Sequence, residues 1–201
     1  MDQKNSGPPQ EEEENPTRNP WTRLSRRLAY QNPWIMVYED QVLRPDGQPG
    51  IYGVVHFRNR AVAIVALDDQ DRVLLVGQYR YPLDQYSWEI PEGGASHEEE
   101  PLAAAQRELQ EETGFSAGRW QVLLRAHLSN SVSDEEAFCY LAQDLRQGTA
   151  RPEGTEQLQV RWVPFGEALA MTADGRITDA LTVLSLQRLA LLRLPVSPPP
   201  G

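Results

Sequence analysis

Three glutamates recur at helical spacing within one stretch of the chain. Glu108, Glu111 and Glu112 stand at positions i, i+3 and i+4, so a helix would carry their carboxylates on one face near its C-terminal end. Like charges at this spacing destabilise an isolated helix by roughly 0.2–0.5 kcal/mol per pair, and the negative end of the helix dipole adds to that cost. A bound divalent cation would reverse both effects. The spacing therefore indicates a site for Mg²⁺ or Mn²⁺, and the alternative interpretation is an ordinary solvated acidic face.

The residues around these glutamates follow a longer pattern. From position 93 to position 115 the chain reads GGASHEEEPLAAAQRELQEETGF. Seven fixed residues would coincide by chance at on the order of 10⁻⁸ per starting position. The segment resembles the signature of the Nudix hydrolases at every specified position, which are the seven fixed residues Gly93, Glu99, Arg107, Glu108, Glu111, Glu112 and Gly114 and the two apolar residues Leu109 and Phe115.

This resemblance implies a reaction, a fold and a set of site residues. Nudix hydrolases cleave a nucleoside diphosphate linked to a further group, at the pyrophosphate. Their motif forms a loop, a helix and a loop on an α/β/α sandwich with a mixed sheet, so an α/β fold is expected here. By the resemblance, Mg²⁺ or Mn²⁺ would be bound by Glu108, Glu111, Glu112 and the backbone carbonyl of Glu92. Arg107 and Glu99 would orient those carboxylates, which makes Arg107 and Glu111 candidate catalytic residues.

Flanking segments resemble one branch of that family, the hydrolases of ADP-ribose and other nucleoside-diphosphate sugars. The two segments are 78–81, QYRY, and 88–91, WEIP. Arg80 would contact the pyrophosphate, a task suited to a planar guanidinium, and Glu89 would assist the metal or the ribose. Trp34 could stack on the base. The alternative interpretations are a surface arginine for Arg80 and ordinary strand packing for Trp34.

The segment 129–135, SNSVSDE, is expected to be a loop that reaches the substrate. ADP-ribose pyrophosphatases carry a proline fifteen residues past the motif, and this chain has Asn130 there. The amide offers hydrogen bonds that proline lacks, so we expect a broad or hexose-directed activity, with GDP-mannose and ADP-ribose as the substrates to try. Glu135, at the end of the loop, is the candidate general base, and the alternative is an ordinary acidic residue at a turn.

The periodicity predicts the elements that position these residues. Residues 30–42 are expected to be extended, and residues 51–57, 61–67 and 72–79 to be strands of an antiparallel meander. A helix is expected over 98–113, started by a capping box of Ser96 and Glu99 and ended at Gly114. Further strands over 120–128, 136–141 and 159–163 and a closing helix over 179–192 predict a mixed sheet with helices on its faces.

Composition divides the chain into four parts. Residues 1–20 are expected to be a disordered acidic tail, and residues 195–201 a proline tail. Between them we expect an N-terminal antiparallel strand unit over 21–58 and a Nudix hydrolase domain over 59–194. A detached pair of strands is marginal alone, and such units exchange between subunits in the enzymes that this chain resembles, so a homodimer is expected.

The net charge, the lack of long apolar stretches and the single cysteine indicate which partners and which cellular compartment to expect. The net charge of −10 over 201 residues disfavours nucleic acid. No stretch approaches the length of apolar residues needed to span a membrane, and the N-terminus does not resemble a signal peptide. The single cysteine, Cys139, excludes an internal disulfide and fits a cytoplasmic protein.

Two other functions stay open. One is a Nudix-fold sensor that binds a nucleotide sugar without cleaving it. The other is a hydrolase that sanitises nucleotides or acts on RNA caps. The complete set of glutamates favours catalysis, and the acidity of the chain disfavours RNA.

Overall fold

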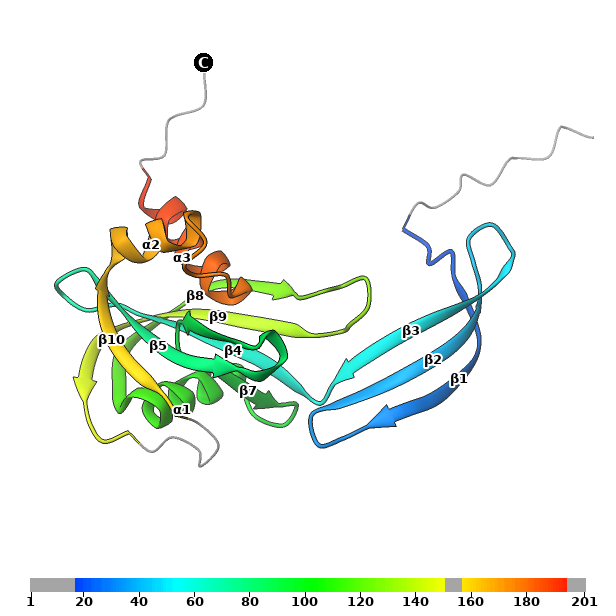
Figure 1. The fold of residues 1–201 in the computed structure, drawn as a ribbon, viewed down its shortest axis with the longest axis horizontal. Helices are drawn as coiled ribbons and strands as arrows, with labels where there is room; N and C mark the ends of the chain where they lie inside the picture. The colour runs from blue at the N-terminus through cyan, green and yellow to red at the C-terminus, as the bar shows by residue number, and fades with distance from the viewer. Residues whose placement is uncertain (1–16, 151–156, 195–201) are drawn as a thin grey trace, which may run out of the picture.

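A computed structural model describes residues 17–150 and 157–194. The expectations for residues 1–16 and 195–201 lie outside the described residues. The described chain forms a small N-terminal sheet beside a larger body of two sheets and three helices (Figure 1). Among these residues, no helix combines the length and the apolar character that crossing a membrane requires.

The N-terminal sheet is antiparallel, as expected, in the order β1-β2-β3. Its strands are β1 (Thr22–Gln31), β2 (Ile35–Leu43) and β3 (Pro49–Phe57). The first eight residues of β1 were not anticipated, since all ten of its residues are exposed and the strand therefore shows no alternation of buried and exposed side chains. Beside its backbone pairing with β2, this strand makes an ion pair between Arg26 Nε and Asp40 Oδ1 at 2.7 Å.

The body contains a mixed four-stranded sheet in the order β7-β4-β9-β8, which confirms the predicted sandwich of helices on a mixed sheet. The strands are β4 (Asn59–Ala66), β7 (Glu92–Ser96), β8 (Phe115–His127) and β9 (Glu136–Gln147). β4 runs parallel to β9 and antiparallel to β7. A second, antiparallel sheet has the order β10-β5-β6, with β5 (Arg72–Arg80), β6 (Gln85–Glu89) and β10 (Gln159–Pro164).

The expectation of one meander was wrong, because β3, β4 and β5 lie in three different sheets. Between β4 and β5 there is only the bridge of Leu67 and Val73. The physical reason is that β4 is buried on both faces. Residues 62–66 are completely buried, and they alternate between two hydrophobic clusters, which include Val62 and Ile64 in one and Ala63 and Val65 in the other. A strand of this kind takes a central place with a partner on each side.

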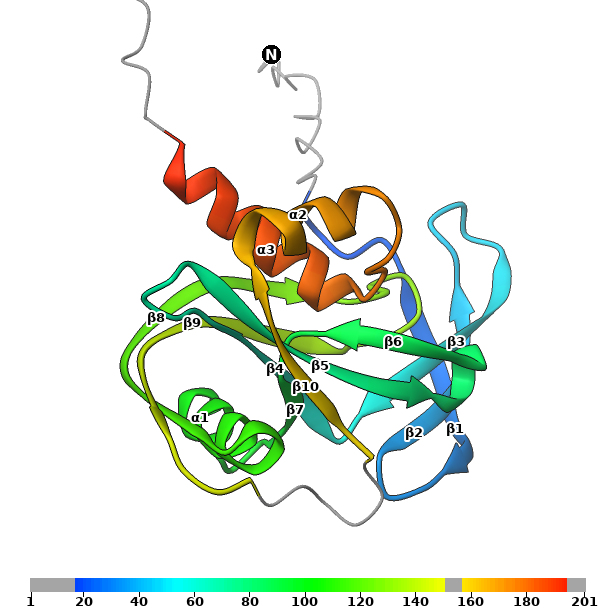
Figure 2. The same ribbon diagram turned by 60° about the vertical axis from the view of Figure 1, so that its left-hand side comes forward.

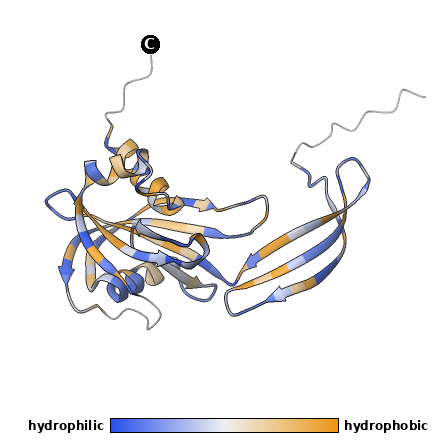
Figure 3. Cartoon of the chain, viewed as in Figure 1, coloured by the Kyte–Doolittle hydropathy of each residue, from blue (hydrophilic) through white to orange (hydrophobic). Residues whose placement is uncertain are grey.

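Helices cover both faces of the body (Figure 2). They are α1 (Pro101–Thr113) on one face, and α2 (Phe165–Ala173) and α3 (Ala180–Arg193) on the other. Figure 3 shows the hydrophobic residues along the strands that these helices enclose. The apolar side chains of α1 pack in the cluster of Val62, while those of α2 and α3 pack in the cluster of Ala63.

The start of α1 differs from the prediction. The helix begins at Pro101, and no side chain caps it, because Ser96 ends β7 and Glu99 turns to Arg107 instead. Proline favours the first helical position, and the residue before it is pushed out of the helical region. Gly114 ends the helix with a φ of +77°, as predicted. The closing helix begins one residue later than expected, with Asp179 as its N-terminal cap.

Candidate active site

Arg107 is the centre of the charged face of α1. Its Nη1 lies 2.7 Å from Glu108 Oε1 and 2.9 Å from Glu111 Oε2, and its Nη2 lies 3.1 Å from Glu99 Oε2. The same Nη2 donates to the carbonyl oxygen of Gly94 at 2.9 Å. The hydrogen bonds with Glu99 and the other carboxylates raise the pKa of Arg107 above its usual range. The spacing alone implied that the negative charges of this face repel one another without compensation. In the structure, Arg107 supplies a positive charge that compensates them.

The loop that precedes α1 lies directly against these carboxylates. A Cβ placed on Gly93 would overlap the carboxylate of Glu108, so a larger residue there would displace that carboxylate. Glu112 is 4% exposed, and its Oε2 accepts a hydrogen bond of 3.2 Å from the backbone N–H of Glu92. Glu92 and Gly93, at the start of β7, thus contact two glutamates of α1, Glu112 and Glu108.

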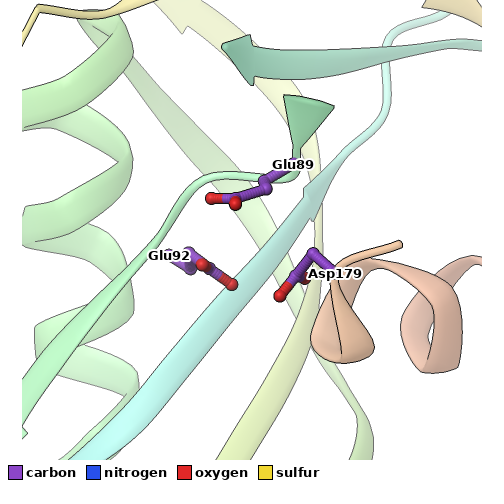
Figure 4. A group of neighbouring side chains, drawn as sticks. All are labelled: Glu89, Glu92 and Asp179. Carbon is purple, nitrogen blue, oxygen red and sulfur yellow. The ribbon is translucent and has the colours of Figure 1, made fainter. Parts of the chain in front are cut away.

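A second group of acids lies across this loop. Ligand oxygens of Glu89, Glu92 and Asp179 all fall within 4.8 Å of one another (Figure 4). Among the residues that the structure describes, this is the one group of three or more possible ligands at such spacing, so the predicted ligands Glu108, Glu111 and Glu112 do not form such a group with the side chains as they stand. Sequence reasoning named Glu89 and Glu92 but missed Asp179. The only local signal for Asp179 was its position before a helix, where its Oδ2 accepts from Thr182 N–H at 2.7 Å.

Arg80 is the counter-charge of this second group. Its Nε lies 2.9 Å from Glu89 Oε1, and its Nη2 bonds to Glu92 Oε1. Burial alone would raise the pKa of Glu89, which is 2% exposed, but the guanidinium outweighs burial and holds that pKa below its usual value. Burial, and then the charges of Asp179 and Glu89, raise the pKa of Glu92 well above its usual value.

The second carboxylate oxygen of Glu92 has no such compensation. Glu92 Oε2 is buried and has no hydrogen-bond partner among the described residues. A buried carboxylate oxygen without a partner is costly, and a divalent cation is a partner that hard oxygen ligands accept. The donor set therefore fits a cation of the Mg²⁺ type.

A pocket of about 270 Å³ opens on this group. Arg80, Glu89, Glu92 and Asp179 contribute charged side chains to its wall, and Leu83 contributes an apolar one. A separate pocket of about 260 Å³ is lined by residues that include Arg107 and Glu111. One guanidinium beside several carboxylates is an arrangement that can hold a cation and a phosphate together.

The loop between β8 and β9 contains two adjacent acids with different surroundings. Asp134 is fully engaged, since His56 Nδ1 contacts its Oδ2 and Phe57 N–H donates to its Oδ1 at 3.0 Å. Glu135 is half-buried, and its carboxylate makes no hydrogen bond or ion pair with any described residue. Burial raises the pKa of Glu135. Of the two, Glu135 has the carboxylate that is free to take a proton.

Three other residues of the sequence analysis have different surroundings. Trp34 is 69% exposed at the turn between β1 and β2, and Asn130 is exposed in the β8–β9 loop. Neither lines the pocket at Arg80 within one chain. Cys139 is buried, as expected, and burial raises its pKa to about 11, so it is no nucleophile at neutral pH.

Comparisons with known proteins match two parts of the chain. Residues 57–182 match the family model described as the NUDIX domain, and residues 21–55 match the nucleoside diphosphate sugar hydrolase N-terminal domain. An ADP-ribose pyrophosphatase of Mycobacterium tuberculosis is 39% identical over 150 residues, which cover 72% of this chain and 70% of that protein. A GDP-mannose pyrophosphatase of Yersinia pestis is 31% identical over 137 residues, 64% of this chain and 69% of that protein.

Solved structures support the fold. The crystal structure of an ADP compounds hydrolase superposes with a TM-score of 0.78 at 22% identity and covers 86% of this chain and 93% of the other. The shared architecture therefore extends over the N-terminal sheet and the body together.

Proposed function

Because the chain belongs to the Nudix hydrolase family, we propose that it hydrolyses the pyrophosphate of nucleoside-diphosphate sugars to a nucleoside monophosphate and a sugar phosphate. The observation that carries the proposal is the pocket in which Arg80 lies between Glu89 and Glu92, beside the glutamates of α1. The names of the relatives, an ADP-ribose and a GDP-mannose pyrophosphatase, support the same substrate class.

The proposed cofactor is Mg²⁺, or Mn²⁺, bound by Glu108, Glu111 and Glu112 together with Glu92. When bound, such cations neutralise the pyrophosphate and lower the pKa of an attacking water. The unpartnered oxygen of Glu92 supports a ligand role for its carboxylate in addition to its carbonyl. Arg107 Nη1 bonds to both Glu108 and Glu111 and so orients their carboxylates.

Arg80 is proposed to bind the pyrophosphate. In the structure its guanidinium neutralises Glu89 and Glu92, and 35% of its side chain is exposed to the pocket and solvent. Once those carboxylates have a cation as partner, the guanidinium is free to pair with a phosphate, for which its planar fork is suited. Glu135 is proposed to accept the proton of the attacking water.

A substrate panel tests the reaction class. We expect kcat/KM for at least one nucleotide sugar, with ADP-ribose and GDP-mannose both included, to exceed that for every nucleoside triphosphate. Release of monophosphate and sugar phosphate is the measurement, since cleavage between the phosphates yields both. The proposal is contradicted if triphosphates are the better substrates, which favours nucleotide sanitation, or if nucleotide sugars bind without turnover, which favours a sensor.

Asn130 is proposed to help select the sugar. Its amide sits in an exposed loop, where it could bond to a hexose hydroxyl. Within the same panel, Asn130→Pro should shift the ratio of kcat/KM towards ADP-ribose. An unchanged ratio would show that Asn130 does not select the sugar. The proposed stacking of Trp34 on the nucleobase is tested in the same way, by substitution of Trp34.

A homodimer is proposed as the assembled state. The N-terminal sheet leaves large apolar side chains uncovered in the single chain, including Leu24 at 59%, Leu28 at 44% and Ile51 at 66% exposure. Uncovered apolar side chains of this kind are typical of an interaction surface, and a sheet of three strands gains stability when it is covered.

Light scattering tests the dimer. At micromolar concentration the intact protein should have twice its chain mass of 22.7 kDa. Leu28→Glu should shift it to monomer by burying a charge at the interface. Leu192→Glu is the matched control, because this leucine is equally exposed at 46% but lies in α3. A wild-type mass of a single chain would disprove the dimer.

The proposed location is the cytoplasm and the proposed partner is a nucleotide sugar, with neither nucleic acid nor membrane involved. The net charge of −10 supports the exclusion of nucleic acid. The single buried cysteine supports a reducing compartment.

A further inference from the structure

The loop between β8 and β9 is attached to the N-terminal sheet. Val55 N–H donates to the carbonyl oxygen of Val132 at 2.8 Å, and Asp134 N–H donates to the carbonyl oxygen of Val55 at 3.2 Å. These bonds form a parallel bridge between Val55 and Ser133. Tyr52 Oη donates to the carbonyl oxygen of Ser131 at 2.7 Å. Strand β3 therefore supports a loop that stands almost eighty residues later in the chain.

Asp134 completes this attachment through its side chain. Both of its carboxylate oxygens are bound by β3, one by His56 Nδ1 and the other by Phe57 N–H. Burial raises the pKa of Asp134, but the bonds from His56 and Phe57 outweigh that effect and hold it below the usual value. A charged carboxylate only accepts hydrogen bonds, so the proton of this pair is assigned to His56 Nδ1.

Glu135 is the next residue, and its own side chain has nothing to orient it. Its carboxylate has no partner among the described residues, while its backbone carbonyl accepts from Leu128 N–H at 3.1 Å. The direction of the side chain therefore depends on the backbone on either side of it. On the N-terminal side that backbone is fixed by Asp134.

We infer that His56 is a positioning residue for catalysis: by holding Asp134, it fixes the segment that aims Glu135. The inference rests on the proposed function, in which Glu135 is the general base. His56 also stacks on His97, which belongs to the segment before α1, with ring centroids 6.5 Å apart and planes inclined by 10°. The imidazole of His56 thus lies between the β8–β9 loop, which contains Glu135, and the segment that leads to α1.

Substitutions at His56 test the inference. His56→Ala should lower kcat about 10- to 100-fold, the scale expected for a displacement of about 1 Å, with KM and the Mg²⁺ concentration for half-maximal rate unchanged. His56→Asn should restore most of kcat, because its amide presents an N–H donor near the position of Nδ1. His97→Ala is the matched control, since it removes the stacked ring and leaves the bond to Asp134, and it should keep the wild-type kcat.

A double-mutant cycle shows whether the effect passes through Glu135. In a Glu135→Gln background, His56→Ala should cause no further loss. If the full loss appears again on top of that caused by Glu135→Gln, the positioning role is wrong while the role of Glu135 stands. If Glu135→Gln alone keeps the wild-type kcat, the proposed base is wrong and the inference fails with it.

Hydrogen exchange gives a readout that does not depend on activity. In the full chain without substrate, His56→Ala should speed exchange of the amide of Asp134, whose bond to Val55 the side-chain contact supports, and His97→Ala should not. Unchanged exchange at Asp134 in His56→Ala would overturn the inference, even where kcat falls.

Discussion

Replacing Glu112 by glutamine is expected to lower kcat by about 10³-fold while the protein stays folded. The residue is 4% exposed and lies where α1 faces the loop at Glu92 and Gly93. Glutamine keeps an oxygen that can accept from Glu92 N–H, so the packing survives, but the charge that binds the metal is lost. A metal contributes several kcal/mol to the stabilisation of a phosphoryl transition state, and each 1.36 kcal/mol is tenfold in rate.

The measurement is kcat as a function of Mg²⁺ concentration, together with thermal unfolding of the free protein. Glu98→Gln is the control, because it removes the same charge from an exposed position just before the helix. The control should match the wild type in rate. Hydrolysis by Glu112→Gln at the parent rate with saturating Mg²⁺ would show that Glu112 is not a ligand. Removal of divalent cations with a chelator should abolish the activity of the wild type as well.

Replacing Glu135 by glutamine is expected to lower kcat by ~10²–10⁴-fold, the usual contribution of a general base. The substitution changes one atom of a half-buried side chain that makes no hydrogen bond within the described chain, so little else is disturbed. Burial raises the pKa of Glu135, which brings the carboxylate closer to the pKa that suits proton transfer near neutral pH. Asp134 cannot serve in the same way while both of its oxygens are held by β3.

Single-turnover rates and Mg²⁺ titrations separate this effect from that of Glu112→Gln. Glu135→Gln should keep the half-maximal Mg²⁺ concentration of the wild type, whereas Glu112→Gln should raise it. Glu167→Gln, an exposed position in α2, is the control for loss of a charge. An unchanged kcat would assign the base to a glutamate of α1 instead.

The sequence determined the parts of this protein that are local. The spacing of Glu108, Glu111 and Glu112 predicted one face of a helix, and Gly114 predicted its end, because both depend on residues within one or two turns. The β-branched runs of β4 and β5 were recognised for the same reason. The start of α1 was misplaced because a capping box was expected at Ser96, although Pro101 was the stronger signal.

Only the tertiary structure decided which distant residues meet. Asp179 joins Glu89 and Glu92 because the first turn of α3 packs at the ends of β6 and β7, where Thr182 Oγ1 accepts from Ile90 N–H at 3.0 Å. Arg107 and Arg80 compensate the two groups of acids, a balance that spacing does not reveal. His56 and Asp134 are 78 positions apart, and nothing near either one predicts their contact. Local propensity fixes helices and strands, whereas contacts across the chain arise from the packing of β4 between two layers and of β3 against the β8–β9 loop.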